Sequence, residues 1–261
     1  MTRLLLCLAA AGMLVLQSAC VSVPPAGEAR ADTDPSSADK RARVRLELAS
    51  AYFGRGQLST ALDEVKVALA AKPDLAEAFN LRGLIYSGMG EPQLAEQSYQ
   101  RALQLAPRDG DTLHNHGWFL CQQRRYDEGD VQFAAAMAAP QYLDGARTAM
   151  ARGICQARAG KWADAERHLA RAFELDPANP AIAFSFAEVL YRRGDLERAR
   201  FYVRRVNGAQ DQSNAQTLAL AARIERRLGN MPGVEDFVRQ LRERFPDAPE
   251  TQQLLRGQFD E

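Results

Sequence analysis

A repeat of about 34 residues runs through most of this chain, and it restricts the possible folds more than any other feature. A first column of small residues recurs at intervals of 34, 34, 36, 34 and 35 residues, at Ala49, Gly83, Gly117, Gly153, Ala187 and Ala222. A second column follows each of these twelve positions later, at Ala61, Ala95, Gly129, Ala165, Ala199 and Val234. Such a period indicates copies of one supersecondary unit, each of which buries its apolar face against its neighbours.

Glycines and prolines mark the helix ends within this period. Glycines recur where a left-handed residue would close the first helix of a unit, at Gly56, Gly90, Gly160, Gly194 and Gly229. Prolines recur between units, where a helix must stop, at Pro73, Pro107, Pro177 and Pro246. The pattern resembles the tetratricopeptide repeat (TPR), which has two antiparallel helices in 34 residues.

We therefore predict an all-α fold, a right-handed TPR superhelical solenoid of six helix-turn-helix repeats. The expected units span residues 42–75, 76–109, 110–145, 146–179, 180–214 and 215–248, and residues 249–261 form a C-terminal cap or tail. The third unit is irregular, because Arg124 stands where the turn glycine is expected and two extra residues occur within residues 138–145. This loop is expected to separate two sub-stacks.

The first residues read as an export signal. Arg3 supplies a short positive region, and residues 4–16 are an uninterrupted apolar run. A membrane-spanning helix needs about 20 apolar residues, so this shorter run fits the apolar region of a secretory signal. We predict a signal peptide over residues 1–19.

The end of this signal resembles a bacterial lipobox. Small residues lead into Cys20, although Gln17 stands where that family usually has Leu. The resemblance implies cleavage before Cys20 and acylation of that residue, and Val21 in place of Asp favours transfer to the outer membrane. An ordinary signal peptide cut elsewhere is the alternative. Residues 20–41 are rich in Pro, Ser and Ala without a helical apolar period, which predicts a lipidated, flexible tether below a periplasmic TPR domain.

The chain carries no pattern typical of catalysis or of nucleic-acid binding. Its 33 basic and 33 acidic residues give a net charge of zero, which excludes binding to nucleic acid through electrostatics alone. His114 and His116 are two apart on a predicted helix, where a metal site would favour a spacing of four, and His168 lies on another unit. We expect no enzyme activity, metal, cofactor or small-molecule substrate.

Two cysteines remain once Cys7 of the signal and Cys20 are set aside. Cys121 and Cys155 lie on the first helices of consecutive units, and first helices of consecutive TPR units are neighbours. An even pair in an oxidising compartment favours a disulfide. Two separate buried thiols remain the alternative from the residues alone.

Two segments resemble a specific TPR family. NHGWFLC (residues 115–121) and RGIC (residues 152–155) are similar to segments of the PilF/PilW lipoproteins of type IV pilus biogenesis, with His116 in place of the usual Tyr. The resemblance supports a Cys121–Cys155 disulfide. It also implies the role of a pilotin, which binds the type IV pilus secretin (PilQ-like), brings it to the outer membrane and promotes its multimerisation. The alternative is a lipid-anchored TPR scaffold in outer-membrane protein assembly.

The TPR resemblance also places a groove. Positions 2, 5, 9, 12 and 13 of a first helix face the concave side in TPR proteins. Applied to the first two units, this rule gives an apolar strip with polar flanks that suits an amphipathic helix or an extended peptide. The predicted partner-binding residues are Arg43, Leu46, Ser50, Phe53, Asn80, Leu84 and Ser87. The alternative is that these residues are simply exposed on the groove.

Overall fold

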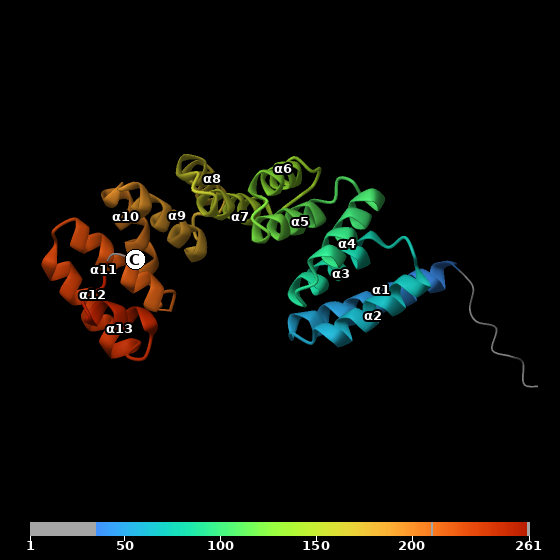
Figure 1. The fold of residues 1–261 in the computed structure, drawn as a ribbon, viewed down its shortest axis with the longest axis horizontal. Coiled ribbons are helices and arrows are strands. Elements are labelled where there is room, and N and C mark those ends of the chain that lie inside the picture. The colour runs from blue at the N-terminus through green and yellow to red at the C-terminus, as the bar shows by residue number, and fades with distance from the viewer. Residues whose placement is uncertain (1–34, 210, 260–261) are drawn as a thin grey trace, which may run out of the picture.

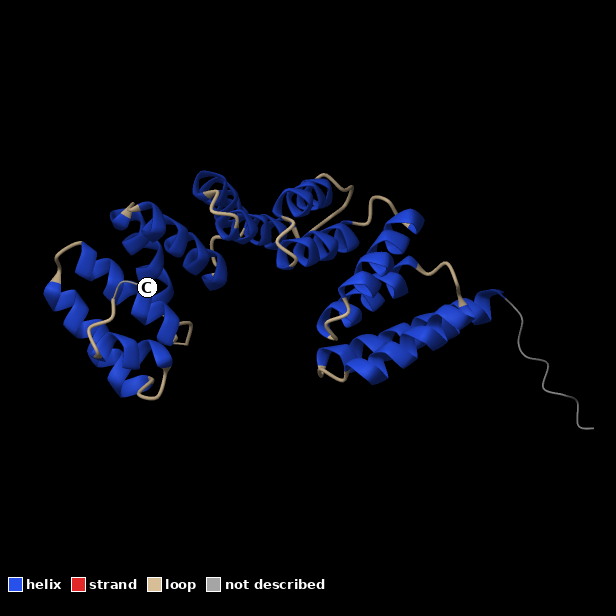
Figure 2. Cartoon of the chain, in the orientation of Figure 1, coloured by secondary structure: helices blue, strands red, loops and turns tan. Residues whose placement is uncertain are grey.

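A computed structural model describes residues 35–209 and 211–259, and within these ranges the chain forms thirteen α-helices and no strands (Figures 1 and 2). The predicted signal peptide, Cys20 and the predicted tether up to residue 34 lie outside the described residues. None of the described helices is long and apolar enough to cross a bilayer.

The helices form six consecutive antiparallel pairs and one last helix. Their bounds are α1 (Pro35–Gly54), α2 (Leu58–Ala71), α3 (Ala76–Gly88), α4 (Pro92–Leu105), α5 (Gly110–Gln122), α6 (Tyr126–Met137), α7 (Gly145–Arg158), α8 (Trp162–Leu175), α9 (Pro180–Arg193), α10 (Leu196–Asn207), α11 (Ala215–Arg227), α12 (Met231–Arg244) and α13 (Pro249–Leu255). The first helices of neighbouring units contact each other along the whole array. The prediction of an all-α TPR superhelix is confirmed, and the units follow an arch whose ends are α1/α2 and α11–α13 (Figure 1).

The column of small residues exists because the two helices of a unit nearly touch. A Cβ added to Gly83 would lie 2.6 Å from the Tyr99 ring, and one added to Gly153 would lie 2.6 Å from Cγ of Leu169. Real Cβ atoms do not approach other atoms this closely, because van der Waals repulsion rises steeply inside contact distance. Small residues on the first helix therefore make room for the large buried side chains on the second.

The turns within the units use left-handed residues, as the glycine pattern predicts. Gly56, Gly90, Gly160, Gly194 and Gly229 all have φ between 72° and 83°. The irregular third unit adopts the same turn with Arg124 at φ 62°. An L side chain pays a small conformational penalty there, but the backbone still closes the helix, since the amide of Arg124 donates to the Cys121 carbonyl.

The N-terminal boundary corrects the sequence prediction. Helix α1 begins at Pro35, so residues 35–41 belong to the folded array and not to the tether expected to run through residue 41. Proline fits the first turn of a helix because its fixed φ is already helical and its missing N–H needs no partner there. Asp39 then pairs with Arg43 one turn later and with Lys72 just after α2, which attaches the start of α1 to the rest of its unit.

The C-terminal end of the array is covered. Helix α13 packs on α11 and α12, and Leu254 and Phe259 are buried among Leu218, Val234 and Leu241. The hydroxyl of Thr251 donates to the Phe245 carbonyl at 2.7 Å and holds the short helix in place. Residues 249–259 therefore form a cap over the last unit.

Candidate partner-binding groove

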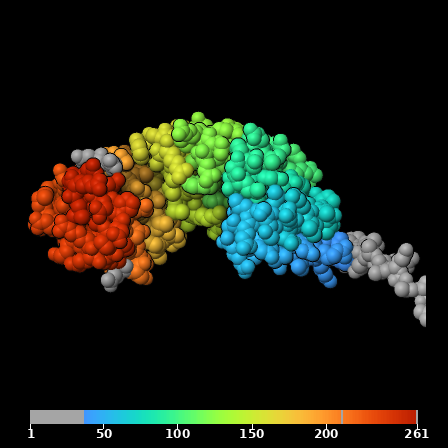
Figure 3. All heavy atoms as spheres, turned by 60° about the horizontal axis from the view of Figure 1, so that its bottom comes forward, coloured from blue at the N-terminus to red at the C-terminus, as the bar shows by residue number. Residues whose placement is uncertain are grey.

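A hollow on the inner side of the arch is the candidate site. It has a volume of about 460 Å³ and is lined mainly by side chains of α1, α3, α5 and α7, which are the first helices of four consecutive units. Its lining residues are Phe53, Leu84, Ser87, Gly88, Tyr99, His114, Asn115, Trp118, Phe119, Gln122, Arg147, Met150, Ala151 and Ile154. The space-filling view shows the curved body of the array (Figure 3). We call this hollow the groove pocket.

The structure places three of the seven predicted groove residues, Phe53, Leu84 and Ser87, in the wall of the groove pocket. Asn80 lies beside it, where its side-chain oxygen accepts a hydrogen bond from Asn115 at 3.1 Å. The remaining three, Arg43, Leu46 and Ser50, lie in the middle and second half of α1 and do not line the hollow.

Those three α1 residues have local partners. Arg43 pairs with Asp39 at 3.0 Å, and the Ser50 hydroxyl donates to the Leu46 carbonyl at 3.0 Å. Leu46 is half-buried against the core of the first two units. These contacts are therefore made within the first unit or with the second.

Most of the pocket wall comes from units three and four, which contain none of the predicted groove residues. Residues at positions 5, 9 and 13 of the third unit are His114, Trp118 and Gln122. Positions 2, 5 and 9 of the fourth unit are Arg147, Met150 and Ile154, and all six line the pocket. The TPR position rule, extended to these two units, therefore identifies these six residues from the sequence. The sequence did not reveal that the hollow is centred on α5.

One edge of the pocket carries a short chain of polar groups. Asn115 donates to the Asn80 side-chain oxygen at 3.1 Å, and Arg147 donates to the Asn115 side-chain oxygen at 3.4 Å. Arg147 also lies 3.5 Å from Asp144 and stays largely exposed. These groups offer amide and guanidinium hydrogen bonds beside an apolar wall, which is the combination that fixes the orientation of a bound segment.

The floor of the pocket is uncharged at neutral pH. Burial lowers the pKa of His114 to about 4, and its Nδ1 lies 2.8 Å from the Thr148 hydroxyl. Burial also raises the pKa of the Tyr99 phenol, so both groups are neutral. Trp118 stands at the wall with the Arg158 guanidinium over its ring at 4.9 Å. The wall is therefore largely apolar, and the floor offers no ionised acid or base.

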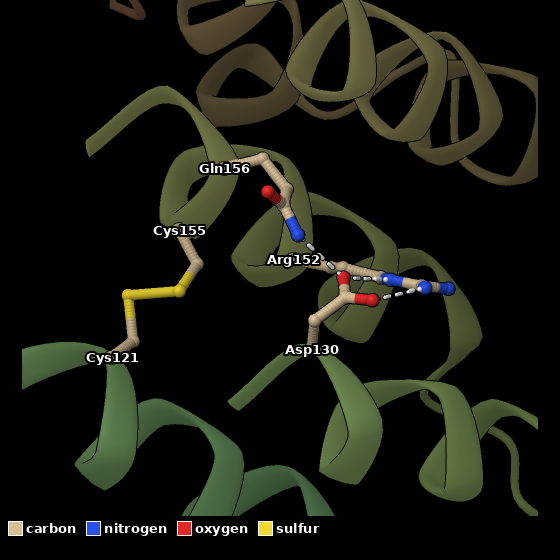
Figure 4. Close-up of a disulfide and its surroundings, with 5 residues drawn as sticks. All are labelled: Cys121, Asp130, Arg152, Cys155 and Gln156. Atoms are coloured by element: carbon tan, nitrogen blue, oxygen red, sulfur yellow. Dashed lines mark hydrogen bonds and ion pairs between the residues drawn. A yellow bond between two sulfur atoms is a disulfide. The ribbon is translucent and has the colours of Figure 1, made fainter. Parts of the chain in front are cut away.

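The pocket wall is braced by a covalent link from behind. Cys121 of α5 and Cys155 of α7 form a disulfide with their Cα atoms 5.8 Å apart (Figure 4). Both sulfur atoms are buried. Cys121 follows Trp118 by one helical turn and Cys155 adjoins Ile154, so the bond fixes the spacing of the two helices that carry much of the wall.

Beside the disulfide, α6 and α7 are joined by an ion pair. Asp130 accepts from Arg152 and from the Gln156 amide, and the picture shows all three side chains meeting at one carboxylate (Figure 4). The hydrogen bonds from Arg152 hold the pKa of Asp130 below its usual value.

The loop at residues 138–144 is also packed, because Tyr142 lies over Gly110 and its hydroxyl is 2.6 Å from the Thr148 hydroxyl. The expected break between sub-stacks is thus a bridged junction.

Comparison with known proteins places the chain among TPR proteins. Models of the tetratricopeptide repeat match residues 76–109 and 156–224. The type IV pilus assembly protein PilF of Pseudomonas aeruginosa is 26% identical over 227 residues, which are 85% of this chain and 90% of PilF.

Two solved structures share both the fold and part of the sequence. The crystal structure of PilW, a widely conserved type IV pilus biogenesis factor, matches with a TM-score of 0.76 at 27% identity and covers 82% of this chain and 98% of PilW. A structure of Pseudomonas aeruginosa PilF matches with a TM-score of 0.74 at 25% identity and covers 85% of this chain and 99% of PilF. Repeat signature, sequence and architecture agree, and the chain is therefore a PilF/PilW-like tetratricopeptide-repeat protein.

Proposed function

We propose that this protein is a pilotin of type IV pilus biogenesis, an outer-membrane lipoprotein that binds the pilus secretin and promotes its outer-membrane localisation and multimerisation. The chain is similar over most of its length to PilF and PilW, which are named for type IV pilus assembly and biogenesis. This similarity supports a role in type IV pilus biogenesis. The observation that carries a binding role is the apolar groove pocket across four first helices.

The groove pocket suits a short amphipathic segment of the secretin. Phe53, Leu84, Trp118, Met150 and Ile154 provide the apolar wall. An amphipathic helix or extended segment would bury its apolar side chains there, while its polar groups meet the amide and guanidinium groups along the edge. The mechanism is binding, and nothing covalent happens to the partner.

The proposed lipid anchor would place the bound secretin at the outer membrane. Acyl chains on Cys20 would hold the array at the inner face of the outer membrane, since two or more chains give stable anchoring where one is marginal. A secretin segment held in the groove would then experience a high effective concentration at that membrane. Neighbouring anchored copies would collect secretin subunits where their ring is assembled.

The decisive experiment is deletion of the gene followed by analysis of the secretin. We expect heat-resistant secretin multimers to disappear from the outer-membrane fraction and to return with the wild-type gene. Complementation with Cys20→Ala should leave the secretin multimers reduced or misplaced, and labelled palmitate should be incorporated only by the wild-type protein.

Normal secretin multimers in the deletion strain would reject the pilotin assignment. Loss of other barrel proteins with twitching motility intact would instead favour a scaffold of outer-membrane protein assembly. Palmitate incorporation in the Cys20→Ala protein would reject Cys20 as the anchor without bearing on the groove.

A further inference from the structure

The two ends of the array differ in whether their apolar side chains are buried or exposed. The C-terminal end is covered by α13, as solenoid ends usually are. At the other end, Val44 and Leu48 of α1 and Val67 of α2 are 61%, 36% and 45% exposed. They line a second hollow of about 470 Å³ between the two helices. We call it the end groove.

The end groove is apolar along its floor and basic at its margin. Lys40, Arg41 and Arg45 line it together with the three apolar residues, and its lining contains no acidic residue. Arg45 is paired with Glu64, and Arg41 donates to Ser37. Long basic side chains that flank exposed apolar ones form the pattern of surfaces that lie in a lipid interface, since the apolar groups enter the headgroup region while the cations meet phosphate.

The position of the end groove in the chain also indicates that it faces a lipid surface. Helix α1, which begins at Pro35, forms one end of the arch together with α2 (Figure 1). Val44 is nine residues further, or about 14 Å along the helix. Fourteen residues separate Cys20 from Pro35, and they span at most about 50 Å when fully extended. An acylated Cys20 would therefore hold this end of the array within about 50 Å of the lipid headgroups.

We propose that the end groove is a docking surface for anionic phospholipid. It binds the bilayer through Val44, Leu48 and Val67, with Lys40, Arg41 and Arg45 against the phosphate groups. The inference rests on the outer-membrane anchor proposed above. In this arrangement the first unit lies on the membrane and the groove pocket is held at a fixed height, so the anchor sets the location of the protein while the end groove sets its orientation.

The test isolates the end groove from the acyl chains. The chain from residue 20 onward, carrying Cys20→Ala, is sedimented with vesicles of phosphatidylcholine containing 30% phosphatidylglycerol, and with vesicles of phosphatidylcholine alone. We expect at least fivefold more protein bound to the anionic vesicles at low salt, and a loss of most of this binding in 0.5 M salt because the Debye length shrinks to a few Å.

Two matched pairs of variants locate the contact. Val44→Ser/Leu48→Ser should reduce binding to the anionic vesicles at least fivefold. Leu94→Ser/Val131→Ser, whose residues are 40% and 63% exposed on α4 and α6, should leave it unchanged. Lys40→Gln/Arg41→Gln should weaken binding, while Arg167→Gln/Arg171→Gln on α8 should not. Thermal unfolding followed by circular dichroism verifies that all four variants keep the fold.

Several results would overturn the proposal. These are failure of the parent chain to bind anionic vesicles, equal binding to both vesicle types, or equal losses in the test and control pairs. A dimer that is lost in Val44→Ser/Leu48→Ser, with no vesicle binding, would assign the end groove to a second copy of the chain. Secretin multimerisation is scored separately, so a failed pilotin assignment with intact vesicle binding is recognisable.

Discussion

Arg152 donates two parallel hydrogen bonds to the Asp130 carboxylate, from Nε to Oδ1 at 2.6 Å and from Nη2 to Oδ2 at 2.7 Å. The pair links α6 of the third unit to α7 of the fourth, next to the disulfide that links α5 to α7. The amide of Gln156 donates to the same Oδ1 at 2.7 Å. The most irregular junction of the array is therefore the one with the most specific crosslinks.

Replacing Arg152 should cost more stability than replacing an exposed arginine. Arg152→Ala leaves the partly buried Asp130 carboxylate with only the Gln156 amide, and we expect a loss of about 2 kcal/mol in the free energy of unfolding. Arg167→Ala, which removes an exposed pair with Asp164, should change stability too little to resolve. Urea denaturation of both variants measures the difference, and equal losses would contradict a special role for the junction.

The stabilisation by the Arg152–Asp130 pair should be lost at acid pH. Because Arg152 lowers the pKa of Asp130 in the folded state, the stabilisation is complete above the ordinary carboxyl pKa and is lost as pH falls through the lower folded-state value. The stability difference between wild type and Asp130→Asn should therefore shrink below about pH 4. Denaturation midpoints at pH 7 and pH 3.5 test this, and a constant difference would rule it out.

Breaking the disulfide should destabilise the array and loosen the groove pocket. The bond closes a loop with a sequence separation of 34, for which the chain-entropy model gives about 3–4 kcal/mol. We expect Cys121→Ala/Cys155→Ala to lose about this amount in denaturant unfolding and to match the reduced wild-type protein. Reductant should slow the wild type on a non-reducing gel and leave the double variant unchanged.

His116 is expected to weaken the fold at its position. It is only 6% exposed and stacks on Tyr99 with ring centroids 5.5 Å apart, and neither ring nitrogen has a hydrogen-bond partner. A buried polar atom without a partner costs about 1–3 kcal/mol. His116→Phe keeps an aromatic ring in the stack and should raise the free energy of unfolding by about 1 kcal/mol. A loss of stability would show that the space is too small for phenyl.

The three histidines together predict acid sensitivity in a defined range. Burial lowers the pKa of His114 and of His168 to about 4 and also lowers that of His116. The unfolded chain takes up protons near pH 6.5 while the folded chain does not, so stability is complete above about pH 6.5 and falls as the pH drops towards 4. Melting temperatures at pH 7.5 and 5.0 should differ, and less so in His116→Phe.

Leu84→Glu should weaken secretin binding without unfolding the array. Leu84 is half-buried at the pocket wall, where a carboxylate would oppose an apolar ligand. Leu94→Glu on the more exposed face of α4 is the control and should bind normally. Pull-down of the secretin measures both. Arg43→Ala should also bind normally, since Arg43 does not line the pocket, and unchanged binding by Leu84→Glu would remove this site.

The sequence determined the repeated unit and the way its helices meet. Gly83 and Gly153 mark contacts where only a hydrogen atom fits beside Tyr99 and Leu169, and such constraints recur with the period of the chain. The closing turns are equally local, since the left-handed residue acts on the backbone of its own unit. The third unit shows that this geometry persists with Arg124 in place of glycine.

Only the tertiary structure decided where the groove lies and where the array begins. Which first-helix residues share one hollow depends on the rotation between successive units, which is the summed result of many small packing contacts. Phe53 and Ile154 therefore line the same hollow although about a hundred residues separate them in the sequence, while Arg43 does not line it. The first turns of α1 are also joined to the rest of the unit by the pairing of Asp39 with Lys72, and a partner 33 positions away leaves no local trace in the sequence.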